Sequence, residues 1–80
     1  MKRSFNVVYC SLRKLGIDRE SILKNFNLRN DLGIGSLDML VLTNQLEFGL
    51  NIAIPDEDIN KLNNFEGILN YLKGNYPSLR

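Results

Sequence analysis

A glycine-flanked turn that ends in a serine is the segment of this sequence whose residue types could support chemistry. Residues 31–38 are Asp-Leu-Gly-Ile-Gly-Ser-Leu-Asp, and a helical pattern begins at Ser36. A serine at the head of a helix is exposed, and its hydroxyl can either cap the helix or accept a covalently attached group. A serine hydrolase is excluded, because its nucleophile elbow needs a second flanking glycine at position 38, which is Asp, and a histidine base, which the chain lacks.

The remaining composition excludes most other catalytic sites. Without histidine the chain lacks the commonest zinc ligand, general base and proton shuttle, and its single cysteine, Cys10, cannot form an internal disulfide. We therefore expect no enzyme and no metal site, and we expect Cys10 to be a small buried residue. Eighty residues, 44% of them hydrophobic, predict one folded domain over 1–80.

Charge is distributed unevenly along the chain. Residues 1–30 hold seven Lys and Arg against two acids, whereas residues 31–60 hold six acids and no Lys or Arg. The cations are dispersed, with few aromatic side chains between them, so we expect no nucleic-acid partner. The longest apolar runs are far too short to span a membrane, and the first 14 residues lack the features of a signal peptide, which predicts a cytoplasmic protein.

The serine must be positioned by helices, and two long ones flank an aperiodic segment. Apolar residues at helical spacing predict a helix over residues 4–15, with Ser4 as its N-cap and Gly16 at its end. The strongest pattern predicts a second helix over residues 36–50. Between them, residues 16–35 are expected to form a long loop, packed down by its apolar side chains. These anchors are Ile17, Ile22, Leu23, Phe26, Leu28 and Leu32.

The last third of the chain predicts two further helices. A short one is expected over residues 55–59, because Pro55 suits a first turn. The next begins at a capping arrangement of Asn63 and Glu66 and ends at Gly74. No strand pattern is visible. The fold class is therefore all-α: a small four-helix bundle of three longer helices and one short helix, with a long loop between the first two.

The helix that begins at Ser36 has two apolar stripes on opposite sides. One stripe is Met39, Leu42, Leu46 and Leu50, which we expect to face the core. The opposite stripe is Leu37, Val41, Asn44 and Phe48. Its apolar members are scattered surface side chains, cover the long loop, or form a docking surface for a partner.

Residues 30–74 resemble the acyl carrier proteins, with no gap needed across the stretch. The resemblance rests on Asp31-Leu32-Gly33, on Ser36-Leu37-Asp38 and on residues 54–57, Ile-Pro-Asp-Glu, all at the family's spacing. In that family an Asp-Ser-Leu triplet carries 4′-phosphopantetheine on its serine. Here Gly35 stands where the family usually has Asp.

The resemblance implies that Ser36 carries 4′-phosphopantetheine, transferred from coenzyme A by a phosphopantetheinyl transferase. The chain would then be a monomeric carrier that holds acyl groups as thioesters and presents them to acyl-transferring or condensing enzymes of lipid biosynthesis or specialised tailoring. The alternative is a carrier-like helical interaction module that is never modified. Gly35, in place of the family's usual Asp, is the feature that suggests this alternative.

Two further sets of residues follow from this resemblance. Carriers of this family present the outer side of the second helix, usually acidic, to partner enzymes, which here implies docking by Leu37, Asp38, Val41, Glu47 and Phe48. They also shelter the acyl chain between helices. The residues that could line such a pocket, or could equally form an ordinary core, are Leu46, Ile54, Ile59, Leu62 and Ile68.

Overall fold

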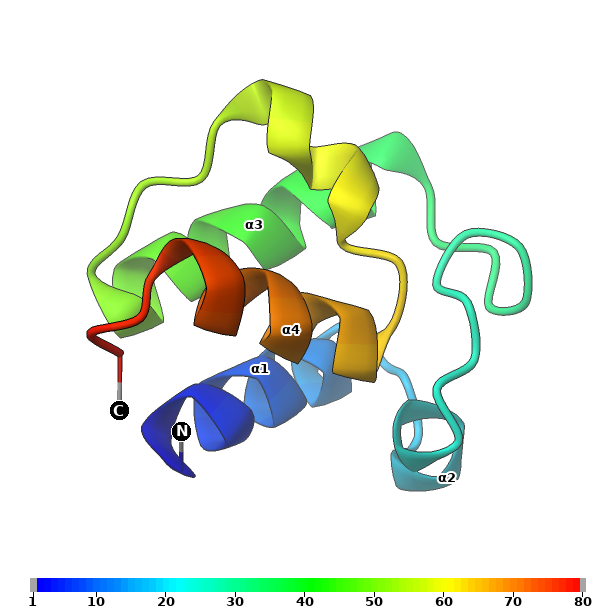
Figure 1. Cartoon of the computed structure of the whole chain (residues 1–80). Helices are drawn as coiled ribbons and strands as arrows, with labels where there is room; N and C mark the ends of the chain where they lie inside the picture. The colour runs from blue at the N-terminus through cyan, green and yellow to red at the C-terminus, as the bar shows by residue number, and fades with distance from the viewer. Residues whose placement is uncertain (1, 80) are drawn as a thin grey trace.

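A computed structural model describes residues 2–79 as a small bundle of helices (Figure 1). The elements in chain order are α1 (Lys2–Lys14), α2 (Arg19–Leu23), α3 (Ser36–Leu50), the 3₁₀ helix η1 (Asp56–Lys61) and α4 (Phe65–Asn75). Within these residues no strand is present. The predicted all-α class is therefore confirmed, with three long helices and two short ones.

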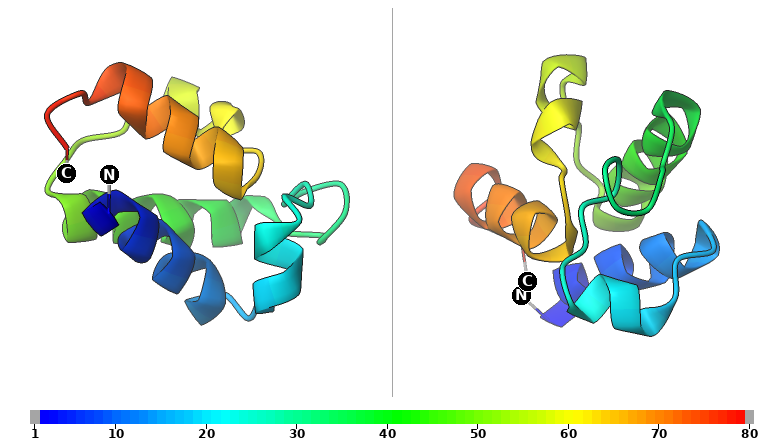
Figure 2. Two further views of the ribbon diagram at one scale, coloured as in Figure 1. Left: turned by 60° about the horizontal axis from the view of Figure 1, so that its bottom comes forward. Right: turned by 90° about the vertical axis from the view of Figure 1, so that its right-hand side faces the viewer.

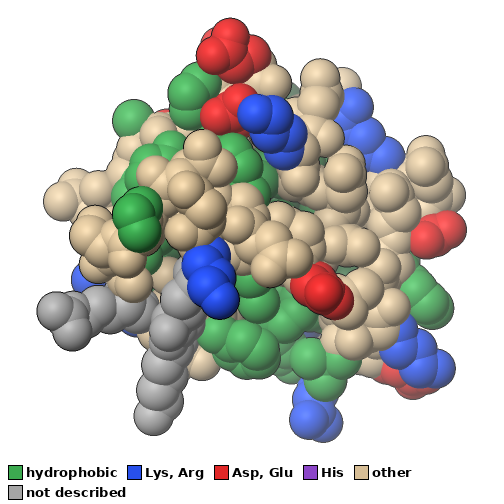
Figure 3. Space-filling view, viewed as in Figure 1, with side chains coloured by type: hydrophobic (Ala, Val, Ile, Leu, Met, Phe, Trp, Pro, Cys, Tyr) green, Lys and Arg blue, Asp and Glu red, His purple; other side chains and the backbone are tan. Residues whose placement is uncertain are grey.

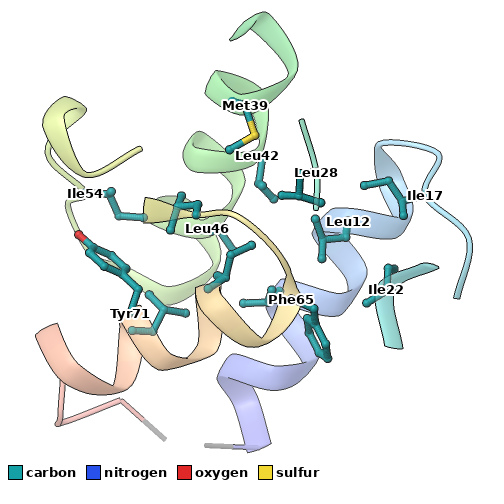
Figure 4. Packing of buried hydrophobic residues seen from close by; sticks show 14 of the residues in the cluster. Leu12, Ile17, Ile22, Leu28, Met39, Leu42, Leu46, Ile54, Phe65 and Tyr71 are labelled. Carbon is teal, nitrogen blue, oxygen red and sulfur yellow. The ribbon is translucent and has the colours of Figure 1, made fainter. Parts of the chain in front are cut away.

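The long helices α1, α3 and α4 surround one core, and η1 packs on α3 and α4 (Figure 2). The predicted core stripe of α3 is confirmed, because Met39, Leu42, Leu46 and Leu50 are all buried. Figure 4 shows the two ends of this core: Leu12, Ile17, Ile22 and Leu28 gather at one end, and Ile54 and Tyr71 lie at the other.

Helix α1 begins two residues before its predicted start. Ser4 is not its N-cap but lies inside the helix, fully buried on the same face as Val8 and Leu12. A serine at i−4 and i−8 from two core residues shares their face, and its small side chain fits beneath neighbouring helices. Gly16 does end the helix as predicted, because its φ of +93° lies in the left-handed region that favours glycine.

The prediction that Cys10 is buried is wrong, since the structure exposes it. Cys10 follows Val8 by two positions, which rotates it about 200° away from the core face of α1. That core face is completed by small or polar residues, Ser4 and Ser11, which are both buried. Because the core side of α1 is partly made of serines, hydrophobicity alone misplaces the cysteine.

The segment between α1 and α3 is more ordered than a loop. It contains the short helix α2, whose five residues are too few to show a helical period. Of the predicted anchors, Ile17, Ile22 and Leu28 are buried and Leu32 is partly buried. Leu23 and Phe26 are exposed, so their prediction as anchors is wrong.

Helix α4 is capped one residue later than predicted. Asn64, not Asn63, is the N-cap, and its Oδ1 accepts a hydrogen bond from the backbone N–H of Gly67 at 2.7 Å. The backbone N–H of Glu66 donates instead to Asn25 Oδ1, at 2.8 Å, which ties α4 to the segment after α2. The prediction that α4 ends at Gly74 is wrong by one residue. Gly74 does not adopt the left-handed conformation that ends a helix, and α4 continues to Asn75.

The predicted short helix at residues 55–59 is present as η1, which begins one residue later and is a 3₁₀ helix, wound more tightly than an α-helix. Pro55 is its N-cap residue. Its acidic residues gather at the edge of the molecule above α3 in the view of Figure 3. The Tyr71 hydroxyl donates to Asp58 Oδ2 at 2.6 Å, and Lys61 Nζ lies 3.1 Å from Asp58 Oδ1. The hydrogen bond holds η1 against α4, and the ion pair lies within η1.

Replacing Tyr71 by phenylalanine should make unfolding less sensitive to acid. The hydrogen bond from Tyr71, with a further contribution from Lys61, holds the pKa of Asp58 below its usual 3.8. A carboxyl group whose folded-state pKa is lowered stabilises the fold above about pH 4 and loses this contribution as the pH falls through the folded pKa. Urea unfolding should therefore show Tyr71→Phe less stable than the parent near neutral pH, and the two curves converging in acid.

Tyr76→Phe is the matched control for this prediction. The Tyr76 hydroxyl donates to a neutral acceptor, the backbone carbonyl of Ala53. Its removal should lower stability by a similar amount at every acid or neutral pH. A Tyr71→Phe deficit that does not change with pH would contradict the role assigned to Asp58.

Candidate functional site

The turn that precedes α3 is ordered by its own polar side chains. Asn27 Oδ1 accepts hydrogen bonds from the backbone N–H groups of Arg29 and Asn30, at 3.0 and 2.9 Å. Asp31 Oδ2 accepts from the backbone N–H of Asn27 at 2.8 Å, which closes the turn from the other side. This Asx-type bonding fixes the backbone without any regular element.

One backbone hydrogen bond joins this turn to the rest of the molecule, and a second closes the turn on itself. The N–H of Leu28 donates to the carbonyl of Asn63, and the N–H of Ile34 donates to the carbonyl of Leu28, both at 2.8 Å. Gly33 has a φ of +68°, a conformation that L side chains rarely adopt, so glycine is needed there. The predicted Asp31-Leu32-Gly33 motif is thus a built turn that delivers the chain to Ser36.

Ser36 is the first residue of α3, and it is exposed. The N-cap is Gly35, and no side-chain hydrogen bond caps this helix end. Across residues 2–79 the Ser36 hydroxyl takes part in no hydrogen bond within the chain. Ser36 therefore does not cap α3, and its Oγ is available for a reaction at the surface.

The end of α3 at which Ser36 lies suits an attached phosphate. The first backbone N–H groups of a helix have no acceptor within it, and the helix dipole places partial positive charge there. The only acidic residue in the first turn is Asp38. A phosphodiester on Ser36 Oγ would meet these N–H groups, as anions do at other helix N-termini. The free hydroxyl of Ser36, its exposure at the surface and the positive end of the helix dipole all fit a 4′-phosphopantetheine group.

Gly35→Asp should be tolerated and should stabilise the fold by a few tenths of a kcal/mol. Gly35 has φ −83° and ψ 175°, which any residue adopts, and a Cβ there would meet nothing within 4 Å. An aspartate at this N-cap could accept a hydrogen bond from the second or third N–H of α3. Urea unfolding measures this gain, and Gly35→Ala is the control, because alanine caps poorly. A clearly destabilised Gly35→Asp variant would contradict the open geometry described here.

The outer stripe of α3 is exposed and does not cover the long loop. Leu37 is 74% exposed, Val41 40% and Phe48 93%. Asp38 and Asn44 are also exposed. Leu40, 46% exposed, borders the same surface and is absent from the prediction, although its helical angle, about 40° from that of Asn44, could have identified it.

Glu47 differs from the other predicted docking residues. Its Oε2 accepts a hydrogen bond from the backbone N–H of Ile54 at 2.8 Å, and its own carbonyl accepts from Asn51 and Ile52. The carboxylate is therefore engaged in holding the connection after α3. A helical pattern could not show this, because the partner is a backbone group of the following connection.

The five predicted pocket residues come together in the core. Leu46, Ile54, Leu62 and Ile68 are buried, and Ile59 is partly buried against them. They come from α3, η1, α4 and the connections between them, on the side of the core where Figure 4 shows Ile54 beside Tyr71. In this conformation they pack against one another as core residues do.

The described residues offer neither a membrane span nor a metal site. Over residues 2–79 every helix is too short or too polar to span a bilayer. The same residues contain no group of three or more metal-ligating side chains.

Comparisons with known proteins agree with the geometry of this site. A family model described as a phosphopantetheine attachment site matches residues 11–72. The chain is 39% identical over 62 residues to an acyl carrier protein of Syntrophobacter fumaroxidans, which covers 78% of this chain and 76% of the relative. It is 37% identical over 59 residues to an acyl carrier protein of Chloroherpeton thalassium, covering 74% of each. Against an acyl carrier protein of Guillardia theta the identity is 34%, over 74% of this chain and 73% of the relative.

Proposed function

Since the chain belongs to the acyl carrier protein family, we propose that Ser36 is the residue that carries its prosthetic group. Members of this family are carriers and not enzymes, and they hold a covalently bound 4′-phosphopantetheine. The thiol of that group holds acyl chains as thioesters. Everything that this chain's own residues contribute is binding, positioning and presentation.

The observation that carries the proposal is the free hydroxyl of Ser36 on an ordered turn. Of the other serines, Ser4 and Ser11 are buried and Ser21 is partly buried, whereas Ser78 is exposed but lies after α4. Ser36 is exposed, begins a long helix and follows a backbone fixed by Asn27 and Asp31. A transferase can therefore reach the hydroxyl without unfolding any element. No base is needed beside Ser36, because the transferase supplies the activating groups together with coenzyme A and its metal ion.

We further propose that acyl-handling enzymes dock on the outer surface of α3 beside Ser36. Leu37, Asp38, Val41 and Phe48 form this docking face, and Glu47 supports it by holding the connection after the helix. Burial of Val41 and Phe48 would contribute about 1.5–3 kcal/mol each, more than exposed ion pairs supply. Such an apolar surface suits dedicated enzymes of lipid synthesis or tailoring, acting on a monomeric carrier in the cytoplasm.

We propose that the acyl chain is sheltered by Leu46, Ile54, Ile59, Leu62 and Ile68. Its entry requires these packed side chains to separate, since they fill the core in the present conformation. Ile59 is the least buried of the five and belongs to the short helix η1. The movement of η1 away from α4 would open this side of the core.

Intact mass after incubation with a broad-specificity phosphopantetheinyl transferase and coenzyme A tests the attachment. The expected result is a gain of one phosphopantetheinyl group, found on the peptide that contains Ser36. A carrier protein of known reactivity is converted in the same tube as the control. An unchanged mass beside a converted control would favour the unmodified helical interaction module, the alternative that Gly35 suggests.

A further inference from the structure

A groove of about 540 Å³ lies between α1 and α3 and is separate from the proposed cargo pocket. Its apolar walls are Val7 and Cys10 from α1, and Val41 and Phe48 from α3. The two helices approach closely at one end, where a Cβ on Gly49 would lie 2.8 Å from Val7 Cγ1. Arg3 Nη2 donates to the Gly49 carbonyl at the same end, at 3.0 Å.

The groove has two polar features that its own chain leaves without partners. Lys14 is the only charged residue that lines it, and within residues 2–79 Lys14 forms no ion pair. Gln45 lines it as well, and its buried Oε1 has no hydrogen-bond partner in the described chain. A buried acceptor without a donor is costly, and an arriving donor would remove that cost.

The groove has the length of two helical turns. Its α3 wall runs from Val41 to Gly49, nine residues whose ends lie about 12 Å apart along the helix axis. An amphipathic helix anchors in a groove through apolar residues at i, i+3 or i+4 and i+7, which span a similar distance. The lining is mainly apolar, as such a helix requires.

Two other occupants fit less well. At about 100° per residue, Gln45 lies on the opposite side of α3 from Ser36, so a chain attached to Ser36 would have to cross the helix to enter the groove. A second copy meeting groove to groove brings no acidic lining residue to Lys14, because none of the lining residues is acidic.

We propose that the groove between α1 and α3 receives an amphipathic helix of a partner protein that carries a carboxylate opposite Lys14. The helix lays its apolar face on Val7, Val41 and Phe48. Gln45 turns its buried amide oxygen toward the groove on docking and accepts a hydrogen bond from one of the helix's polar side chains. Since Val41 and Phe48 belong also to the docking face, this inference rests on the proposed function and adds to it the partner's chemistry: apolar and acidic, not basic.

Selection from a display library of helical peptides, randomised at the apolar and the polar positions alike, tests this proposal. The bait is the full chain with Ser36→Ala, so the result does not depend on whether Ser36 is modified. The expected result is enrichment of peptides with apolar residues at i, i+4 and i+7 and with Asp or Glu at one end. Enrichment of basic peptides, or the absence of any enriched peptide, would overturn the proposal.

Variants of the bait then locate the enriched peptides. Val41→Glu should weaken their binding by about tenfold to a hundredfold, because it places a charge against their apolar face. Lys14→Glu should weaken it by about threefold to tenfold, and a peptide with Lys in place of its acid should recover the loss. Lys73→Glu, which makes the same change on α4 outside the groove, should have no effect. Equal losses from the two lysine variants would refute the assigned site.

The thiol of Cys10 provides an independent measurement of occupancy. It lines the groove, is exposed and is the only cysteine of the chain. Bound peptide should slow its alkylation at least several-fold, and an unchanged rate would place the peptide elsewhere. Alkylation that slows as the protein alone is concentrated, together with a dimer in sedimentation, would instead assign the groove to a second copy and overturn the proposal.

Discussion

Ser36→Ala is expected to abolish the attachment of phosphopantetheine completely while changing the free energy of unfolding by less than about 0.5 kcal/mol. The first effect follows because the variant lacks the only atom to which the group is proposed to attach. The second follows because Ser36 is exposed, does not cap α3 and leaves no hydrogen bond unmade when its hydroxyl is removed. Alanine also has a high helix propensity, so α3 should keep its start.

Intact mass and urea unfolding measure these two effects on the same preparation. Ser78→Ala is the control, since Ser78 is also exposed but lies after α4. It should be modified as fully as the parent chain. A mass gain in Ser36→Ala would assign the attachment to another hydroxyl, and a large loss of stability would show that Ser36 has a structural role.

Helix α3 could be predicted to the residue because several local signals agree there. The turn residues before it, the serine at its start and the core stripe from Met39 to Leu50 all indicate the same helix. The turn before Ser36 could likewise be predicted, because Gly33 is needed for its left-handed backbone conformation. Signals of this kind are contained within a few neighbouring residues, which is why sequence analysis finds them.

Features that depend on distant contacts could not be predicted. The sequence predicts Asn63 as the cap of α4, whereas the structure has Asn64. Both residues suit an N-cap, and only the structure shows which one accepts the hydrogen bond from Gly67. Helix α2 is stabilised by burial of Ile22, not by a period of its own. Cys10 was misplaced because the core face of α1 includes buried serines. In each case tertiary packing decided between local alternatives of similar energy.

The groove between α1 and α3 could not be predicted from the sequence for the same reason. The spacing predicts the apolar stripe of α3, and its exposure excludes burial against the long loop. Scattered surface side chains and the docking that we propose both agree with this exposure. What the spacing could not supply was the opposite wall, because the approach of Val7 to Gly49 joins residues that are distant in the chain. The partner's expected chemistry therefore came from Lys14 and Gln45, which lie near α3 only in the folded molecule.

Leu46→Ala should lower the free energy of unfolding of the unacylated protein by about 2–5 kcal/mol. Leu46 is fully buried, and its truncation removes contacts and leaves a cavity in a close-packed core. Leu12→Ala is the matched control, because Leu12 is equally buried but lies at the end of the core where Figure 4 shows Ile17 and Ile22. Urea unfolding should give losses of similar size for the two variants.

If Leu46 lines the cargo pocket, acylation should raise the free energy of unfolding of Leu46→Ala more than that of Leu12→Ala. An acyl chain joined to the prosthetic group through a stable amide would enter the cavity left by Leu46→Ala, and two methylenes buried there would return about 1.6 kcal/mol. The cavity left by Leu12→Ala lies outside the five pocket residues, so its loss should remain. Because both cavities are apolar and of one leucine's size, a difference between them reports where the chain enters. Equal recovery in both variants, or none in either, would contradict the pocket assigned to Leu46, Ile54, Ile59, Leu62 and Ile68.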